Sequence, residues 1–152
     1  MENEFRELYQ DIIMDHNRSP RNFHKMKEAT HVLDGQNPLC GDHYTLYLKV
    51  NDDQIIEDIS FYGSGCAISK ASASVMSAML KGQSIEKADQ FFKLFQKIVK
   101  GEVDPAEYLD KIGKLAAFSG VSEFPIRVKC ATLPWHTMHK AVHGSNEKVS
   151  TE

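Results

Sequence analysis

The sequence predicts one α+β domain, in which a small three-stranded antiparallel sheet is covered by helices on one face. Three observations lead to this fold class. Residues 3–16 have apolar side chains at helical spacing, residues 44–62 contain two β-forming runs around a turn, and residues 66–143 contain several amphipathic helical stripes. A helix, then a small sheet, then a helical second half is an element order typical of α+β domains.

The first expected helix covers residues 3–16. Its apolar face consists of Phe5, Leu8, Tyr9, Ile12 and Ile13. Pro20 follows, and because proline disfavours helical geometry in the preceding residue, we expect a loop there.

The sheet is expected to be built around a hairpin. Residues 44–50 alternate between the two faces of a strand, residues 55–62 resume in the same style, and Asn51-Asp52-Asp53 between them is a turn signal. A third strand near residues 30–33 would complete a minimal sheet.

The second half is expected to be helical over residues 66–81 and 85–99. Another helix opens at Asp104-Pro105, where the aspartate can cap the N-terminus and the proline suits the first helical position. We expect this helix to run to about Phe118.

The last helix is expected to begin only near Thr132 and to end at His143, because Pro134 is tolerated in a first turn and disruptive in a helix interior. Cys130 would then lie just before it. The domain accordingly covers residues 1–143, and the polar segment 144–152 is expected to be a disordered tail.

Size and charge exclude several classes of protein. The chain has 152 residues, enough for one domain with a core, and its net charge of −3 gives no electrostatic case for a nucleic-acid or membrane partner. No apolar run approaches the roughly 20 residues of a spanning helix, and the acidic N-terminus is unlike a signal peptide. We therefore expect a cytoplasmic protein with reduced thiols.

The residues that carry chemistry are Cys40, Asp42, Cys66 and Cys130, each at the expected boundary of an element. Cys66 follows the Gly63-Ser64-Gly65 turn at a helix start, where the helix dipole favours a thiolate. Three thiolates and a carboxylate give the four ligands of a tetrahedral zinc site, and a carboxylate ligand would make that site exchangeable. The spacing alone leaves the opposite interpretation open, in which the cysteines are small buried hydrophobes.

Three segments resemble the IscU/NifU-type iron–sulfur assembly proteins, and the SufU branch in particular. They are Asn37-Pro38-Leu39-Cys40-Gly41-Asp42, then Phe61-Tyr62-Gly63-Ser64-Gly65-Cys66-Ala67-Ile68-Ser69, then Arg127-Val128-Lys129-Cys130-Ala131-Thr132-Leu133-Pro134-Trp135. The stretch Tyr9 to Asn22 is similar as well, so the resemblance covers the chain to about residue 143. Lys129 stands where the scaffold branch usually has a histidine, and residues 84–107 resemble an insertion of the SufU branch.

This resemblance implies a zinc-dependent sulfurtransferase whose zinc ligands are Cys40, Asp42, Cys66 and Cys130. It implies that Cys40 accepts sulfur as a persulfide from a SufS-type cysteine desulfurase, for delivery to a downstream iron–sulfur assembly complex. Arg127 would be an auxiliary basic residue near the site.

Three other functions remain open from the sequence. A scaffold could assemble a [2Fe–2S] cluster on the same ligands, because thiolates suit such clusters. A structural zinc domain could serve as an interaction module, although the Asp42 ligand argues against it. A cysteine hydrolase is the remotest, because nothing places a histidine base beside a cysteine.

Four histidines lie near these segments. His43 is expected to face solvent, because it follows Asp42 on a strand and so points to the other side. His136, His139 and His143 have helical spacing, and we expect a surface row rather than a second metal site.

Overall fold

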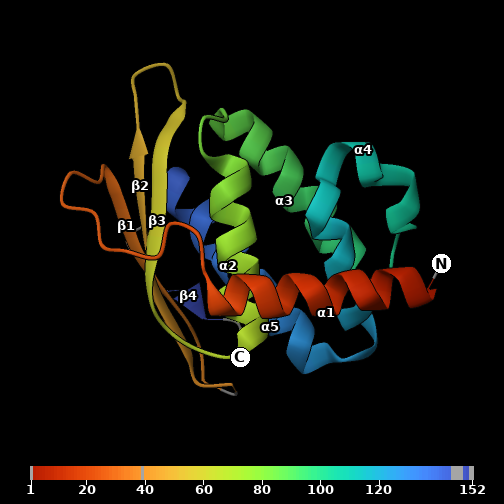
Figure 1. Cartoon of the computed structure of the whole chain (residues 1–152). Coiled ribbons are helices and arrows are strands. Elements are labelled where there is room, and N and C mark those ends of the chain that lie inside the picture. The colour runs from red at the N-terminus through yellow and green to blue at the C-terminus, as the bar shows by residue number, and fades with distance from the viewer. Residues whose placement is uncertain (1, 39, 145–148, 151–152) are drawn as a thin grey trace.

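The computed structural model describes residues 2–38, 40–144 and 149–150, without the side chains of residues 2–6, 8, 9, 109, 112, 149 and 150. Its elements follow one another as shown in Figure 1. They are α1 (Glu2–Arg18), β1 (His31–Asn37), β2 (Asp42–Val50), β3 (Ile56–Ser64), α2 (Ala67–Leu80), α3 (Ile85–Val99), the 3₁₀ segment η1 (Pro105–Tyr108), α4 (Leu109–Ile112), the 3₁₀ segment η2 (Gly113–Glu123), α5 (Pro125–Val142) and β4 (Val149–Ser150).

The predicted three-stranded antiparallel sheet is confirmed. β2 lies between β1 and β3 and pairs with both in antiparallel orientation, with Asn37 opposite Asp42 and His43 opposite Ser64. This register brings the end of β1, the start of β2 and the end of β3 to one edge of the sheet.

A fourth strand was not expected. Val149 and Ser150 pair in parallel with Gly35 and Gln36 of β1, which gives the sheet order β3-β2-β1-β4. For these two residues the prediction of a disordered tail is wrong, because the outer edge of β1 offers unpaired backbone groups that a returning chain can pair with. Residues 145–148 and 151–152 of that predicted tail lie outside the described residues.

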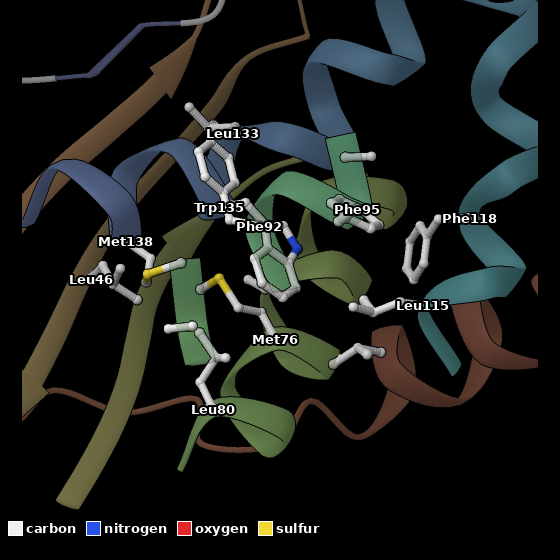
Figure 2. Close-up of a cluster of buried hydrophobic side chains, with 14 of the residues drawn as sticks. Leu46, Met76, Leu80, Phe92, Phe95, Leu115, Phe118, Leu133, Trp135 and Met138 are labelled. Atoms are coloured by element: carbon white, nitrogen blue, oxygen red, sulfur yellow. The ribbon is translucent and has the colours of Figure 1, made fainter. Parts of the chain in front are cut away.

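The helices cover one face of the sheet, as predicted. α2 and α5 lie directly against it, and α3 and α4 lie farther out (Figure 1). Alternate residues of β2 face the helices, among them the buried Leu46 and Leu48. Figure 2 shows Leu46 and Met138 at the sheet side of the core, and Trp135, Phe95 and Phe118 extending it outward.

α1 packs against α2 and η2. Ile12 is buried and Ile13 is half-buried, whereas the side chains of Phe5, Leu8 and Tyr9, also assigned to the apolar face, lie outside the described residues. Among the described residues, no helix combines the length and apolar character that crossing a membrane requires.

The prediction of one regular helix from Asp104 to about Phe118 is wrong. Pro105 does open a helical turn, but the chain runs as 3₁₀, α and 3₁₀ pieces through Glu123. Leu115, Ala116, Ala117 and Phe118 are all buried in succession. Consecutive residues of an α-helix point in different directions, so such a run does not fit one surface helix with a single apolar face.

The predicted start of the last helix is also wrong. α5 begins at Pro125, which occupies a first-turn position, and it continues through Pro134 to Val142. Pro125 is the start signal that the sequence offers, since proline suits the first helical turn. Cys130 therefore lies inside the helix, one turn before Pro134, rather than just ahead of it.

Candidate metal centre

The first part of the site is the turn between β1 and β2. Cys40 lies in this turn, where its backbone N–H donates a 3.2 Å hydrogen bond to the carbonyl oxygen of Asn37. Gly41 follows with a φ of 72°, a conformation that glycine adopts most readily. The turn therefore places Cys40 beside the start of β2, where Asp42 is buried.

The second part is the junction of β3 and α2. Asp42 accepts a 2.7 Å hydrogen bond at Oδ1 from the backbone N–H of Cys66. Gly65 permits this approach, because a Cβ there would lie 2.6 Å from Asp42 Oδ1 and 2.7 Å from the Tyr44 hydroxyl oxygen. Cys66 is the N-cap of α2, and its Sγ accepts a 3.4 Å hydrogen bond from the N–H of Ser69.

The third part comes from α5. Cys130 is buried, and its Sγ lies 2.8 Å from the Sγ of Cys40. All three cysteines are free thiols. The side-chain amide of Asn37 donates to the Cys130 sulfur at 3.5 Å, which ties the end of β1 to the helix.

The four predicted site residues thus meet at one edge of the sheet, and we call them the thiol cluster. The ligand atoms of Cys40, Asp42 and Cys130 all lie within 4.8 Å of one another. The Sγ of Cys66 lies beside this group, 3.9 Å from Asp42 Oδ2. Cys40, Asp42 and Cys130, up to 90 positions apart in sequence, therefore form a group of the size that one ion requires, and Cys66 lies beside it.

Hydrogen bonding divides the protons unequally among the thiols. A hydrogen bond from Cys130, against the opposing effect of burial, lowers the pKa of Cys66 to about 6, and the Ser69 N–H contributes to the lowering. The same interaction, together with burial, raises the pKa of Cys130. These opposite shifts favour the thiolate at Cys66 and the proton at Cys130.

A zinc ion fits the chemistry of this donor set. Three sulfur atoms and one carboxylate supply four ligands of the types that zinc takes, and the Asn37 amide supports one of them from outside the set. In a tetrahedral zinc site, Zn–S bonds of about 2.3 Å separate two sulfur atoms by about 3.8 Å. The Cys40 and Cys130 sulfur atoms therefore need to move apart by about 1 Å to hold the ion.

Sequence reasoning did not single out Asn37 or Ser69 as parts of this site, although both stand in the motif segments. Ser69 follows the N-cap by three residues, a spacing that signals a capping contact. Asn37 carries no comparable signal, because its contact with Cys130 arises from tertiary packing.

Arg127 and His43 lie on the outside. Arg127 is exposed in the first turn of α5, and its guanidinium carbon lies 4.4 Å from the ring centre of Phe124. Its predicted auxiliary role remains a prediction. His43 is exposed and faces Asp34, with Nε2 3.8 Å from the carboxylate, so the prediction that it points away from the thiol cluster is confirmed.

Comparison with known proteins identifies the family. The family model described as the NifU-like N-terminal domain matches residues 8–149. The chain belongs to this family. Among the relatives of this NifU-like chain is the zinc-dependent sulfurtransferase SufU of Bacillus subtilis (strain 168), 44% identical over 137 residues that cover 89% of each protein.

Scaffold proteins of the same family are similar as well. The iron–sulfur cluster assembly scaffold protein IscU of Streptococcus pyogenes serotype M1 is 36% identical over 138 residues, which cover 91% of this chain and 84% of the relative. Among solved structures, a proposed scaffold protein for the SUF system from Fervidobacterium islandicum AW-1 superposes with a TM-score of 0.80 at 35% identity, covering 90% of this chain and 97% of the other. The predicted family and fold are thereby confirmed.

Proposed function

We propose that this NifU-like chain is a zinc-dependent sulfurtransferase of iron–sulfur cluster assembly, which accepts persulfide sulfur from a SufS-type cysteine desulfurase. The observation that carries the proposal is the convergence of Cys40, Cys130 and Asp42, with Cys66 alongside, at one edge of the sheet. The named function of the similar Bacillus subtilis protein supports it. The cytoplasm, where thiols stay reduced, is the compartment that suits this chemistry.

In this proposal the metal ligands are Cys40, Asp42, Cys66 and Cys130. A bound zinc ion would supply positive charge that keeps the thiols deprotonated at neutral pH. Asp42 accepts the Cys66 N–H, and Asn37 donates to the Cys130 sulfur, so two ligands are oriented by neighbouring groups.

Cys40 is the acceptor, because it is the least constrained of the three cysteines. It is half-buried in a turn, whereas Cys130 is buried in a helix and Cys66 caps one. The Cys40 thiolate attacks the outer sulfur of the desulfurase persulfide. An S–S bond forms at Cys40, the S–S bond of the donor breaks, and its electron pair remains on the donor cysteine as a thiolate. Sulfur is transferred without net oxidation, and a downstream assembly complex receives it.

The test uses Cys40→Ala with the desulfurase as partner. We expect the variant to keep its circular dichroism spectrum, to gain no sulfur atom by mass spectrometry and not to accelerate desulfurase turnover. His43→Ala is the matched control, because this exposed residue neighbours Asp42 and points away from the cluster. Sulfur acceptance by Cys40→Ala at the wild-type rate would overturn the role of Cys40.

Assembly of a [2Fe–2S] cluster is the second candidate, because scaffold proteins of the family are similar over most of the chain. Thiolates hold such clusters equally well. Lys129, in place of the histidine usual in scaffolds, argues for sulfur transfer. A purified protein that contains zinc and is colourless supports the first function, and a brown protein with labile sulfide supports the second.

A further inference from the structure

Two histidines of α5 and an aspartate of α3 converge on the side of the molecule where these helices pack together. His139 Nδ1 lies 3.0 Å from Asp89 Oδ1, and His143 Nε2 lies 2.9 Å from Asp89 Oδ2. The ligand atoms of the three residues all lie within 4.8 Å of one another. We call Asp89, His139 and His143 the histidine cluster.

The histidine cluster is held by rigid elements. His139 and His143 are four residues apart on α5 and therefore share one face of the helix. Phe92, one turn after Asp89 on α3, is buried and stacks on the His139 ring with a centroid distance of 4.8 Å and an interplanar angle of 28°. Packing thus fixes both the ring that presents Nδ1 and the helix that presents the carboxylate.

His136 is not part of the cluster, although it belongs to the same helical row. Its ring meets Phe92 edge-on at 5.1 Å between centroids, whereas the contacts with Asp89 come from His139 and His143. The expected uniform surface row therefore divides, and two of its members face a carboxylate from another helix.

We propose that the histidine cluster is a second metal site, for a divalent transition-metal ion of borderline softness such as zinc. Two imidazoles and one carboxylate are the protein ligands of open zinc sites and of non-haem iron(II) sites, whereas magnesium and calcium prefer oxygen ligands. The side chains are 23%, 38% and 48% exposed for Asp89, His139 and His143, so an ion can enter from solvent. The remaining coordination positions would be filled by water.

The distances suit such an ion after a small adjustment. Bonds of about 2.1 Å to nitrogen and oxygen ligands at tetrahedral angles separate those ligands by about 3.4 Å. The histidine nitrogens now lie about 3.0 Å from the Asp89 carboxylate oxygens. An ion that takes the place of the two N–H protons would therefore require each nitrogen and its carboxylate oxygen to move apart by about 0.4 Å. Neutral imidazole can carry its proton on the other ring nitrogen, so both rings can bind without leaving the neutral state.

The site is separate from the thiol cluster. His139 follows Cys130 by nine residues on the same helix, a rise of about 14 Å along the helix axis. Its donors are nitrogen and oxygen without sulfur, so a bound ion differs spectroscopically from one in the thiol cluster. The proposal therefore stands independently of sulfur transfer.

The experiment titrates the metal-free full chain with cobalt(II) as a spectroscopic probe and with zinc for stoichiometry. Thiolate-bound cobalt absorbs strongly in the near ultraviolet, and cobalt in the histidine cluster does not. We expect wild type to bind two ions per chain, the second without added thiolate absorption. Alkylation of the cysteines should abolish the thiolate absorption and leave one ion bound.

Asp89→Asn and His143→Ala are the test variants, and His136→Ala is the matched control. Removing an outer partner of a metal ligand weakens binding about 10–100-fold, so removing a ligand should raise the Kd of the second ion by about 100-fold or more. His136→Ala should keep two ions. His143→Ala truncates a half-exposed side chain, so its fold is at little risk. One ion per chain in wild type, or unchanged second binding in both test variants, would overturn the proposal.

Discussion

The thiol cluster and the histidine cluster both include residues of α5 or its C-cap, yet different parts of the structure hold them in place. The thiol cluster is assembled from a turn, a strand end, a helix cap and a helix interior, and a single backbone approach at Gly65 joins two of these parts. The histidine cluster depends on two helices whose aromatic side chains pack together. Backbone geometry should therefore control the first cluster, and core packing the second.

The largest expected effect comes from Phe92→Ala. Truncation of this buried ring should lower the free energy of unfolding by about 3–5 kcal/mol, as for other buried aromatic residues. It also removes the surface that orients His139. Urea denaturation measures the stability change, and Phe91→Ala is the control because that neighbouring ring is only half-buried. If metal binding by the thiol cluster falls as much as binding by the histidine cluster, the two are not held separately.

Gly65→Ala addresses the other region. The new methyl group would meet Asp42 Oδ1 and the Tyr44 hydroxyl at less than 3.0 Å, so Asp42 must move away from Cys66. We expect the Kd for zinc at the thiol cluster to rise about 10–100-fold, as when support for a ligand is lost, while the histidine cluster is unaffected. Competition with a chromophoric chelator measures this affinity.

Gly120→Ala is the matched control for that variant, because a Cβ at Gly120 meets no atom within 4 Å. Equal zinc affinity in both glycine variants would show that the approach at Gly65 does not position Asp42.

The smallest expected effect concerns proton distribution in the metal-free thiol cluster. Because the pKa of Cys66 is lowered to about 6, Cys66 is a thiolate at pH 7, and its alkylation by iodoacetamide should slow as the pH falls through about 6. Cys130 should react slowest, because it is buried and its pKa is raised. Mass spectrometry of the peptides gives each rate, and urea-unfolded protein is the control. A Cys66 midpoint near the ordinary value of about 8.5 would contradict this assignment.

Local patterns were sufficient for most of the fold. Alternating residues placed β2, and a helical stripe placed α3, because each of these two elements has one buried face. The run of small helix-compatible residues placed α2, although that helix is buried on more than one side. The segment around Phe118 lacks such a face, and its residues are buried in succession, so periodicity could not describe it. Pro134 predicts a late helix start because proline is locally unfavourable in a helix interior. The tertiary packing that keeps α5 continuous through Pro134 is not visible in the sequence.

For the site, the sequence supplied the ligand types and the family resemblance supplied their grouping. The spacing of Cys40, Cys66 and Cys130 could not show that they converge. Their convergence depends on the register of the sheet and on the position of α5 against it. Asp89 was not suspected as a partner of His139, because the two residues meet only through the packing of α3 on α5. β4 could not be predicted either, because a strand of two residues is too short to show a periodic pattern.

Pro134 gives α5 a mechanical property that a regular helix lacks. Proline has no backbone N–H, so the carbonyl oxygen of Cys130 receives no hydrogen bond from the residue one turn later. A bend at this point would break no hydrogen bond of the helical ladder, so we expect α5 to deform more easily here than a regular helix would. Pro134 lies one turn after Cys130, whose sulfur and that of Cys40 must separate by about 1 Å to admit an ion. We therefore expect the proline to ease the adjustment of this helix between an empty and a filled cluster.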